Sequence, residues 1–247
     1  MTQGPVDVIR PISVSADWER IPQDYRVMSV YRRTVNLVDK NGLSHTLISD
    51  DEDFSARTAL IKCVPKVNIE DIINVSSDTA AAVYDPFLPV GQINDRWMPL
   101  IREWKDFLQD CDLKFIAEKW KSCDRISLVG LGPGSTPAGD DFLHGYLTAH
   151  VRCFLEEDNV VINFRKHYKA GSTVKLSENF YQDLFARKIW RRGKVLLETL
   201  EGDDPVKVLD AVNSLILWGH SSGLAWLAGF ASGEEEIKAM DLDRTSF

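Results

Sequence analysis

Hydrophobic residues follow two different periods along the chain, and the change falls near residue 96. In the first third, apolar residues alternate with polar ones in short runs rich in Val, Tyr, Thr and Leu, a pattern typical of strands. These runs cover residues 27–38, 43–48 and 58–64. From Trp97 onwards, apolar residues recur at intervals of three and four, the spacing of amphipathic helices. The pattern predicts a β-rich part followed by a helical part.

A tight turn separates the first two strand runs. Asp39, Lys40, Asn41 and Gly42 contain the Asn-Gly pair that adopts positive φ angles in two-residue hairpin turns. A proline, Pro65, closes the third run. We therefore expect residues 1–95 to form a β-rich domain, either a small sheet or a barrel.

The helical part is predicted over residues 96–247 and gives the chain an α+β class. Its apolar stripes cover residues 100–108, 113–120, 142–154, 176–190 and 206–217. Asp204 and Pro205 form a plausible N-cap and first-turn pair for the last stripe. A short apolar run at 126–129 is expected to be a strand, and the acidic run 234–236 a solvated end of the chain.

Composition limits the classes of partner. The chain has 247 residues, 44% of them hydrophobic and 27% charged, which is typical of a folded globular protein. Its net charge of −8 gives no general attraction for nucleic acid or an anionic membrane. The four scattered cysteines and the absence of a secretory leader pattern predict reduced thiols and a cytoplasmic location. The basic cluster 187–192 is expected to be a solvated helix face, or to hold an acidic substrate or a partner subunit.

Residues 130–141, GLGPGSTPAGDD, contain the densest chemical signal. Glycines at this density allow the backbone to approach a ligand closely, and the helix that follows adds a partial positive charge at its N-terminus. This first glycine segment (residues 130–139) is predicted to bind an anion. The candidate substrate-binding residues are Gly130, Gly132, Gly134, Ser135, Thr136 and Gly139.

Two adjacent acids, Asp140 and Asp141, follow this segment and are the candidate catalytic residues. The alternative is that one of them simply caps the helix. A P-loop is excluded because no Lys-Ser/Thr pair follows the last glycine, and the dinucleotide pattern fails at Ser135. The stretch also resembles the GAGD motif of ribokinase-like sugar kinases, in which Asp140 would be the general base. A small-molecule phosphotransferase is therefore the alternative function.

A second glycine segment (residues 219–223), GHSSG, matches the GxSxG pattern of a nucleophile elbow. In α/β-hydrolases a histidine follows the serine, and no histidine follows His220 here. The segment is therefore expected to be either a turn between helices or a ligand-binding loop. In the second case His220, Ser221, Ser222 and Gly223 bind substrate.

A transition-metal site is not expected. Asp140 and His144 are four residues apart on a helix, with His220 as a third potential ligand, but no metalloprotease-like spacing supports the set. No cofactor is expected, and Mg²⁺ held through water by the two aspartates is left open.

The two glycine segments resemble those of a known family, the smallest of three subunits associated with oxamate carbamoyltransferase in anaerobic allantoin breakdown. This AllH-like family was formerly catalogued as a domain of unknown function, and its genes accompany FdrA-like partners related to acyl-CoA synthetases. Its first segment usually reads GLGPGLTPSGDD, which matches Gly130, Gly132, Gly134, Thr136, Gly139, Asp140 and Asp141, while Ser135 and Ala138 depart. Its second usually reads G[HT][TS]SGxD, and Ala225 stands where an acid is common.

The resemblance implies a transferase subunit in purine catabolism. Its complex would transfer a carbamoyl group between carbamoyl phosphate and a small amide acid such as oxamate, giving an oxalurate-like product. The implied partners are a small anionic substrate and FdrA-like subunits, with homo-oligomerisation left open and neither nucleic acid nor membrane expected. A non-catalytic scaffold subunit is the remaining alternative.

Overall fold

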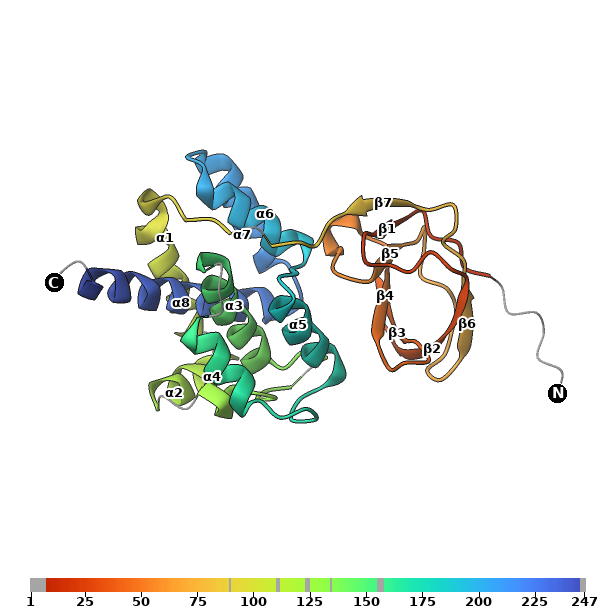
Figure 1. Ribbon diagram of the computed structural model, residues 1–247, viewed down its shortest axis with the longest axis horizontal. Coiled ribbons are helices and arrows are strands. Elements are labelled where there is room, and N and C mark those ends of the chain that lie inside the picture. The colour runs from red at the N-terminus through yellow and green to blue at the C-terminus, as the bar shows by residue number, and fades with distance from the viewer. Residues whose placement is uncertain are drawn as a thin grey trace. The chain divides into compact units, whose positions relative to one another are not determined.

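The computed structural model describes residues 8–88, 90–109, 112–122, 125–133, 135–154 and 158–244, with side chains as far as residue 240. Figure 1 shows strands in the N-terminal third and helices beyond it, which confirms the predicted α+β class. Contacts within the chain divide it into two compact units. One contains the chain up to residue 87 with 188–194, and the other contains 88–187 with the chain from 195 onwards. The domain boundary at residue 95 stays a prediction.

A seven-stranded sheet forms most of the first unit. Its strands are β1 Ser13–Ser15, β2 Gln23–Val30, β3 Thr34–Val38, β4 Ser44–Ile48, β5 Thr58–Leu60, β6 Ile72–Val75 and β7 Ala81–Tyr84. Their order across the sheet is β6-β2-β3-β4-β5-β1-β7, with β4–β5 and β1–β7 parallel and the other pairs antiparallel. Ile9, just before β1, bridges Val75 in β6 at the far edge. The sheet therefore curls round on itself.

A hairpin between β3 and β4 confirms the position of the turn predicted from Asn-Gly, although Gly42 has a positive φ and Asn41 does not. Asp39 Oδ1 accepts hydrogen bonds from the amides of Asn41 at 2.9 Å and Leu43 at 2.8 Å, and Gly42 has φ +79°. The single strand expected at residues 27–38 was wrong, because the chain turns at residues 31–33 and forms β2 and β3. The apolar pattern continues through that turn, so periodicity alone did not locate it.

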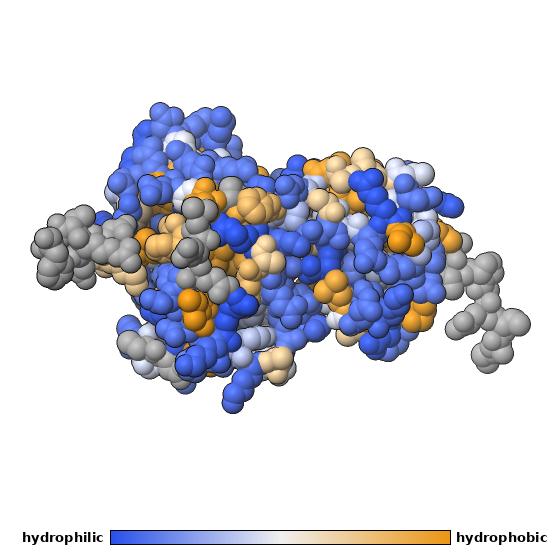
Figure 2. Space-filling model, viewed as in Figure 1, coloured by the Kyte–Doolittle hydropathy of each residue, from blue (hydrophilic) through white to orange (hydrophobic). Residues whose placement is uncertain are grey.

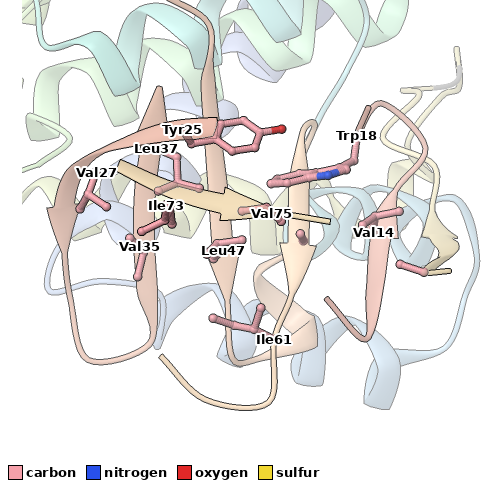
Figure 3. Close-up of a cluster of buried hydrophobic side chains, with 12 residues drawn as sticks. Val14, Trp18, Tyr25, Val27, Val35, Leu37, Leu47, Ile61, Ile73 and Val75 are labelled. Carbon is pink, nitrogen blue, oxygen red and sulfur yellow. The ribbon is translucent and has the colours of Figure 1, made fainter. Parts of the chain in front are cut away.

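The core of this unit lies between the curled strands, as Figure 3 shows. Alternate side chains from β2, β3, β4 and β6 point into it, as period-two strands require. The Trp18 and Tyr25 rings lie 5.6 Å apart, and Trp18 packs edge-on to His45 at 5.2 Å. Burial lowers the pKa of His45 to about 4, so this histidine is neutral near pH 7.

Two arginines of the basic cluster predicted to face solvent or a partner, Arg191 and Arg192, instead pair with acids of the first unit. Arg191 lies 3.1 Å from Asp51, and Arg192 contacts Glu52 at 2.8 Å and Asp53 at 2.9 Å. These acids form the 3-10 turn η1, Asp51–Asp53. Because the acids and the arginines lie far apart in sequence, only the folded chain shows that the cluster has its own counter-charges.

Eight α-helices follow in the described part of the chain. They are α1 Met98–Glu103, α2 Lys114–Lys121, α3 Ala138–Cys153, α4 Asn159–His167, α5 Lys175–Phe185, α6 Arg191–Glu201, α7 Pro205–Ile216 and α8 Ser222–Arg244. The 3-10 turns η2 Asp95–Trp97, η3 Trp104–Gln109 and η4 Arg125–Leu128 connect them. Asp204 caps α7 by accepting from the amides of Val206 and Lys207, which confirms the predicted N-cap.

Two local predictions in this unit were wrong. The strand expected at residues 126–129 lies in η4, because a four-residue apolar run fits a helical turn as well as a strand. The helix expected to reach residue 190 ends at Phe185, and Arg187 has φ +56°, a left-handed conformation that interrupts a helix.

Helices α3 and α8 pack against each other through glycines and lie side by side in Figure 1. A Cβ on Gly145 would lie 2.0 Å from the carbonyl oxygen of Trp226, and one on Gly229 would lie 1.9 Å from that of Phe142. Any side chain at these positions would push the two backbones apart. The sequence therefore brings the helices into direct backbone contact, with α3 buried along nearly its whole length.

The acidic run 234–236 was predicted to be a solvated end of the chain. This prediction was wrong, because the run lies within α8. Glu234 is only 2% exposed and lies 3.9 Å from Arg152 on α3, while Glu236 pairs with Arg125 at 2.7 Å. Burial raises the pKa of Glu234 to about 7. The prediction failed because it used charge alone, whereas α8 runs along a helix that supplies an arginine.

Hydrophilic residues dominate the face seen in Figure 2, with hydrophobic residues scattered between them. Within the described residues, none of the helices has the length and apolar character needed to cross a membrane.

Candidate functional site

The first glycine segment leaves η4 and enters α3 through a backbone that only glycine adopts easily. Gly130 has φ +71° and Gly132 has φ +107°, both in the left-handed region. A Cβ on Gly130 would also lie 2.6 Å from the carbonyl oxygen of Ser172. These glycines are therefore required by the path of the chain. Gly134 lies outside the described residues.

Asp140 fastens this segment to the helices around it. Its carboxylate accepts hydrogen bonds from the Gly130 amide at 2.9 Å, from the Tyr181 hydroxyl at 3.0 Å and from the Thr173 hydroxyl. The side chain is buried, so these donors replace water. Asp140 thus links the glycine turn, the segment before α5, and α5 itself.

Asp141 lies one residue further on and has a different environment. Its Oδ2 accepts from the Thr136 hydroxyl at 3.3 Å, and the Ser222 hydroxyl also bonds to its carboxyl group. Burial raises the pKa of Asp141 to about 8, and nearby Asp140 adds to the increase. A carboxyl group with this pKa can either give or take a proton near pH 7.

The two glycine segments, far apart in sequence, meet at Asp141. Thr136 Oγ1 and Ser222 Oγ lie 3.3 Å apart although 86 residues separate them. Ser222 begins α8 and Thr136 lies just before α3, so the N-terminal ends of both helices lie together. Helix N-termini favour anions, and Ser135 is exposed beside them. We call this place the Thr136–Ser222 junction.

Two predicted substrate-binding glycines make tight packing contacts. The amide of Gly139 donates to the Leu131 carbonyl at 2.9 Å, and its Cβ position lies 2.2 Å from the Leu128 carbonyl oxygen. The Cβ position of Gly223 lies 1.8 Å from the Leu215 carbonyl oxygen. Both glycines are thus required for packing, and their contact with substrate stays a prediction.

The rest of the second glycine segment is the turn from α7 into α8. Gly219 has φ +66°, and the Ser221 carbonyl accepts from the Ala225 amide in the first turn of α8. His220 is exposed, with Nδ1 3.8 Å from Asp112 Oδ2. A substrate-binding role for His220 and Ser221 stays a prediction.

His144, a potential metal ligand together with Asp140, is buried inside the second unit. Its Nδ1 accepts from the Trp226 indole N–H at 3.0 Å, and its ring makes a second hydrogen bond to the backbone of Phe180. Burial lowers the pKa of His144 to about 3, so the ring is neutral near pH 7. Across the described ranges, no three His, Cys, Asp or Glu side chains come together as a metal site.

A small pocket lies beneath the two aspartates. Its lining comprises Asp140, Asp141, His144, Ser177, Phe180 and Tyr181, and its volume of about 10 Å³ is close to the space that one water molecule requires. Ser177 Oγ is buried there and has no hydrogen-bond partner among the described residues. A pocket of this size has room for one water molecule but not for a substrate.

Sequence reasoning missed several residues that build this site. Thr173 and Tyr181 hold Asp140, Ser177 lines the pocket, and Trp226 holds His144. Tyr181 lies in the apolar stripe 176–190, which predicts a core residue, and Trp226 lies beyond the last predicted stripe. No motif includes Thr173 or Ser177. Only the approach of α5 and α8 to α3 reveals their roles.

The structure defines an α+β protein whose helical unit joins two glycine segments over a buried pair of aspartates. Comparison with known families narrows the class of protein further. Residues 128–234, which include both glycine segments, match the model of the family described as oxamate carbamoyltransferase subunit AllH, and this confirms the resemblance. No curated protein and no solved structure matches the chain.

Proposed function

We propose that the chain is a subunit of a carbamoyltransferase complex acting on carbamoyl phosphate and a small amide acid such as oxamate. The Thr136–Ser222 junction binds the substrate anion. The observation that carries this proposal is the 3.3 Å contact between the two hydroxyls, because it joins both glycine segments into one place. The family match over residues 128–234 supports the reaction class.

The chemistry of the junction suits carbamoyl transfer. The amide nitrogen of oxamate attacks the carbonyl carbon of carbamoyl phosphate, a C–N bond forms, the C–O bond to phosphate breaks, and the nitrogen loses a proton. The products are oxalurate and phosphate, and the reverse reaction passes through the same states. Two helix N-termini and two hydroxyls stabilise the phosphate that carries the developing charge.

The two aspartates have different roles in this proposal. Asp140 is a positioning residue, since its carboxylate is bonded to Gly130, Thr173 and Tyr181. Asp141 exchanges the proton through the hydroxyls of Thr136 and Ser222, because its pKa of about 8 lies near physiological pH. Mg²⁺ is not required for this proton exchange, although a water-bound ion near the phosphate is compatible with it.

The rest of the site is supplied by partner chains. The matching family is described as a subunit, and FdrA-like proteins are the partners we propose. We place this complex in the cytoplasm, in line with the acidic sequence and its scattered cysteines.

A thermal-shift panel tests the proposal on the purified chain and on the chain co-purified with an FdrA-like partner. The ligands are carbamoyl phosphate, phosphate, oxamate, oxalurate and Mg-ATP. A ligand at about 100 times its Kd stabilises by about 2.7 kcal/mol, which is a shift of several degrees. Ser222→Ala removes one hydroxyl of the junction, and Ser122→Ala, an exposed hydroxyl bonded to the Lys119 carbonyl, is the matched control.

We expect carbamoyl phosphate or oxalurate to raise the melting temperature, and Ser222→Ala but not Ser122→Ala to reduce the shift. A shift confined to Mg-ATP would support the phosphotransferase instead. The absence of any shift, both alone and with the partner, would contradict the proposal and favour the scaffold role.

A further inference from the structure

A larger cavity lies in the helical unit, away from both glycine segments. It is bounded by η4, α3, α4 and the residues just after α4, and its volume is about 560 Å³. This volume falls within the range of small-molecule binding sites, roughly 300 to 1,000 Å³. Its residues belong to no motif in the sequence.

The cavity has an apolar floor. Five side chains from η4, α3 and α4 form this floor, and two of these side chains are aromatic. They are Ile126, Tyr146, Leu147, Val160 and Phe164. The Tyr146 hydroxyl donates to Glu236 at 2.9 Å, which fixes its ring in the wall. Apolar and aromatic lining with a few polar groups is the usual composition of a ligand site.

The rim of the cavity is basic. Arg125, His167 and Lys169 line it, Asn163 adds an amide, and none of the described lining residues is acidic. Arg125 is partly neutralised by Glu236 at 2.7 Å, and its guanidinium lies 4.8 Å from the centre of the Tyr146 ring. Lys169 is exposed, and no described carboxylate lies within 4.0 Å of it.

This positive rim contrasts with the charge of the whole chain. The net charge is −8, so a cavity whose described charged lining is entirely basic is a local exception. An anionic group attracted to this rim would leave the rest of its molecule over the apolar floor. Carbamoyl phosphate is too small to fill the cavity and has no apolar part.

We propose that this cavity binds an amphipathic organic anion, whose apolar body covers the floor and whose carboxylate, phosphate or sulfonate contacts Lys169 and His167. The cavity is distinct from the Thr136–Ser222 junction. Tyr146 follows Asp141 by five residues on α3, about 8 Å along the helix axis. The binding therefore adds a second ligand to the chain and does not depend on the proposed carbamoyl transfer.

Fluorescence titration with 1-anilinonaphthalene-8-sulfonate, an aromatic sulfonate, tests the proposal on the full chain. Lys169→Glu reverses the exposed charge at the rim, and Val160→Phe fills part of the floor. Lys166→Glu is the matched control, because Lys166 is exposed in α4, three residues before Lys169, but does not line the cavity. Circular dichroism verifies that each variant keeps the wild-type fold, and Lys169→Gln replaces any charge-reversal variant that does not.

We expect both Lys169→Glu and Val160→Phe to weaken binding of the probe by about tenfold or more. The affinity of Lys166→Glu and Ser222→Ala for the probe is expected to stay close to that of wild type. Competition then identifies the source of the anion: AMP displaces the probe if the body is a nucleotide, and octanoate displaces it if the body is an acyl chain. Unchanged affinity in both cavity variants would overturn the proposal. Displacement by inorganic phosphate as effective as by either organic anion would also overturn it, because the apolar floor would then contribute nothing.

Discussion

Asp141 is expected to make the folded chain less stable as the pH rises from about 4 to about 8. Burial raises the pKa of its carboxyl group from 3.8 to about 8. The unfolded chain loses this proton near pH 4, whereas the folded chain keeps it until about pH 8. Between these values the unfolded chain binds fewer protons, so the free energy of unfolding falls with increasing pH. Below pH 4 both states are protonated and the contribution is constant.

The magnitude follows from the size of the pKa change. One pKa unit corresponds to about 1.4 kcal/mol, so the whole change makes ionisation of the folded chain on the order of 5 kcal/mol less favourable. Between pH 5 and pH 7 the free energy of unfolding therefore falls by on the order of 3 kcal/mol. Asp141→Asn removes it, because asparagine has the same shape and does not ionise. Its carbonyl oxygen also accepts hydrogen bonds from the Thr136 and Ser222 hydroxyls.

Urea unfolding at pH 5, 6, 7, 8 and 9, followed by tryptophan fluorescence, measures this difference. The free energy of unfolding of Asp141→Asn minus that of wild type is expected to rise by on the order of 3 kcal/mol from pH 5 to pH 7, and to level off above about pH 8. For the matched control Asp210→Asn, on the exposed side of α7, the difference is expected to stay nearly constant. A flat or falling difference for Asp141→Asn would refute the reasoning.

Two further substitutions test the packing that builds the site. Gly145→Ala is expected to destabilise the chain by about 1 to 3 kcal/mol, measured by thermal unfolding, because its Cβ would lie 2.0 Å from a backbone oxygen of Trp226 and force α3 and α8 apart. Trp226→Phe leaves the buried Nδ1 of His144 without its donor, and urea unfolding should show a loss of about 1 to 3 kcal/mol.

For each of these two substitutions, one result would contradict the predicted loss of stability. Gly202→Ala is the matched control for Gly145→Ala, since the nearest atom to its Cβ position is 3.5 Å away, and it should change stability by less than about 1 kcal/mol. A Gly145→Ala protein as stable as this control would rule out a tight α3–α8 contact. For Trp226→Phe, wild-type stability would show that the indole hydrogen bond is unimportant.

Features set by neighbouring residues were predictable from the sequence. The hairpin depends on an Asn-Gly pair and on Asp39, which bonds amides two and four residues away. The start of α7 depends on Asp204 and Pro205, again within one turn. The change from strand to helix periodicity likewise gave the α+β class, because burial of one face imposes its period on the local sequence.

Features set by distant contacts were not predictable. The turn inside residues 27–38 and the end of α5 depend on which strands and helices the chain meets afterwards. Glu234 is buried because α8 runs beside Arg152, and Arg191 and Arg192 pair with acids in η1. Charge patterns along the sequence show which residues are ionised but not which of them lie together.

The candidate site also combines features set by the local sequence with features set by distant contacts. The sequence determined the glycine turns and the adjacent acids Asp140 and Asp141, because left-handed backbone and short-range helix signals are local properties. Tertiary structure decided that Thr136 and Ser222 meet, since their contact spans 86 residues. It also gave the two adjacent acids different environments, with Asp140 bonded to a backbone amide and two hydroxyls and Asp141 buried at a pKa of about 8. Burial and hydrogen bonding depend on what packs around a side chain, and here α5 and α8, which lie far along the chain, do that packing.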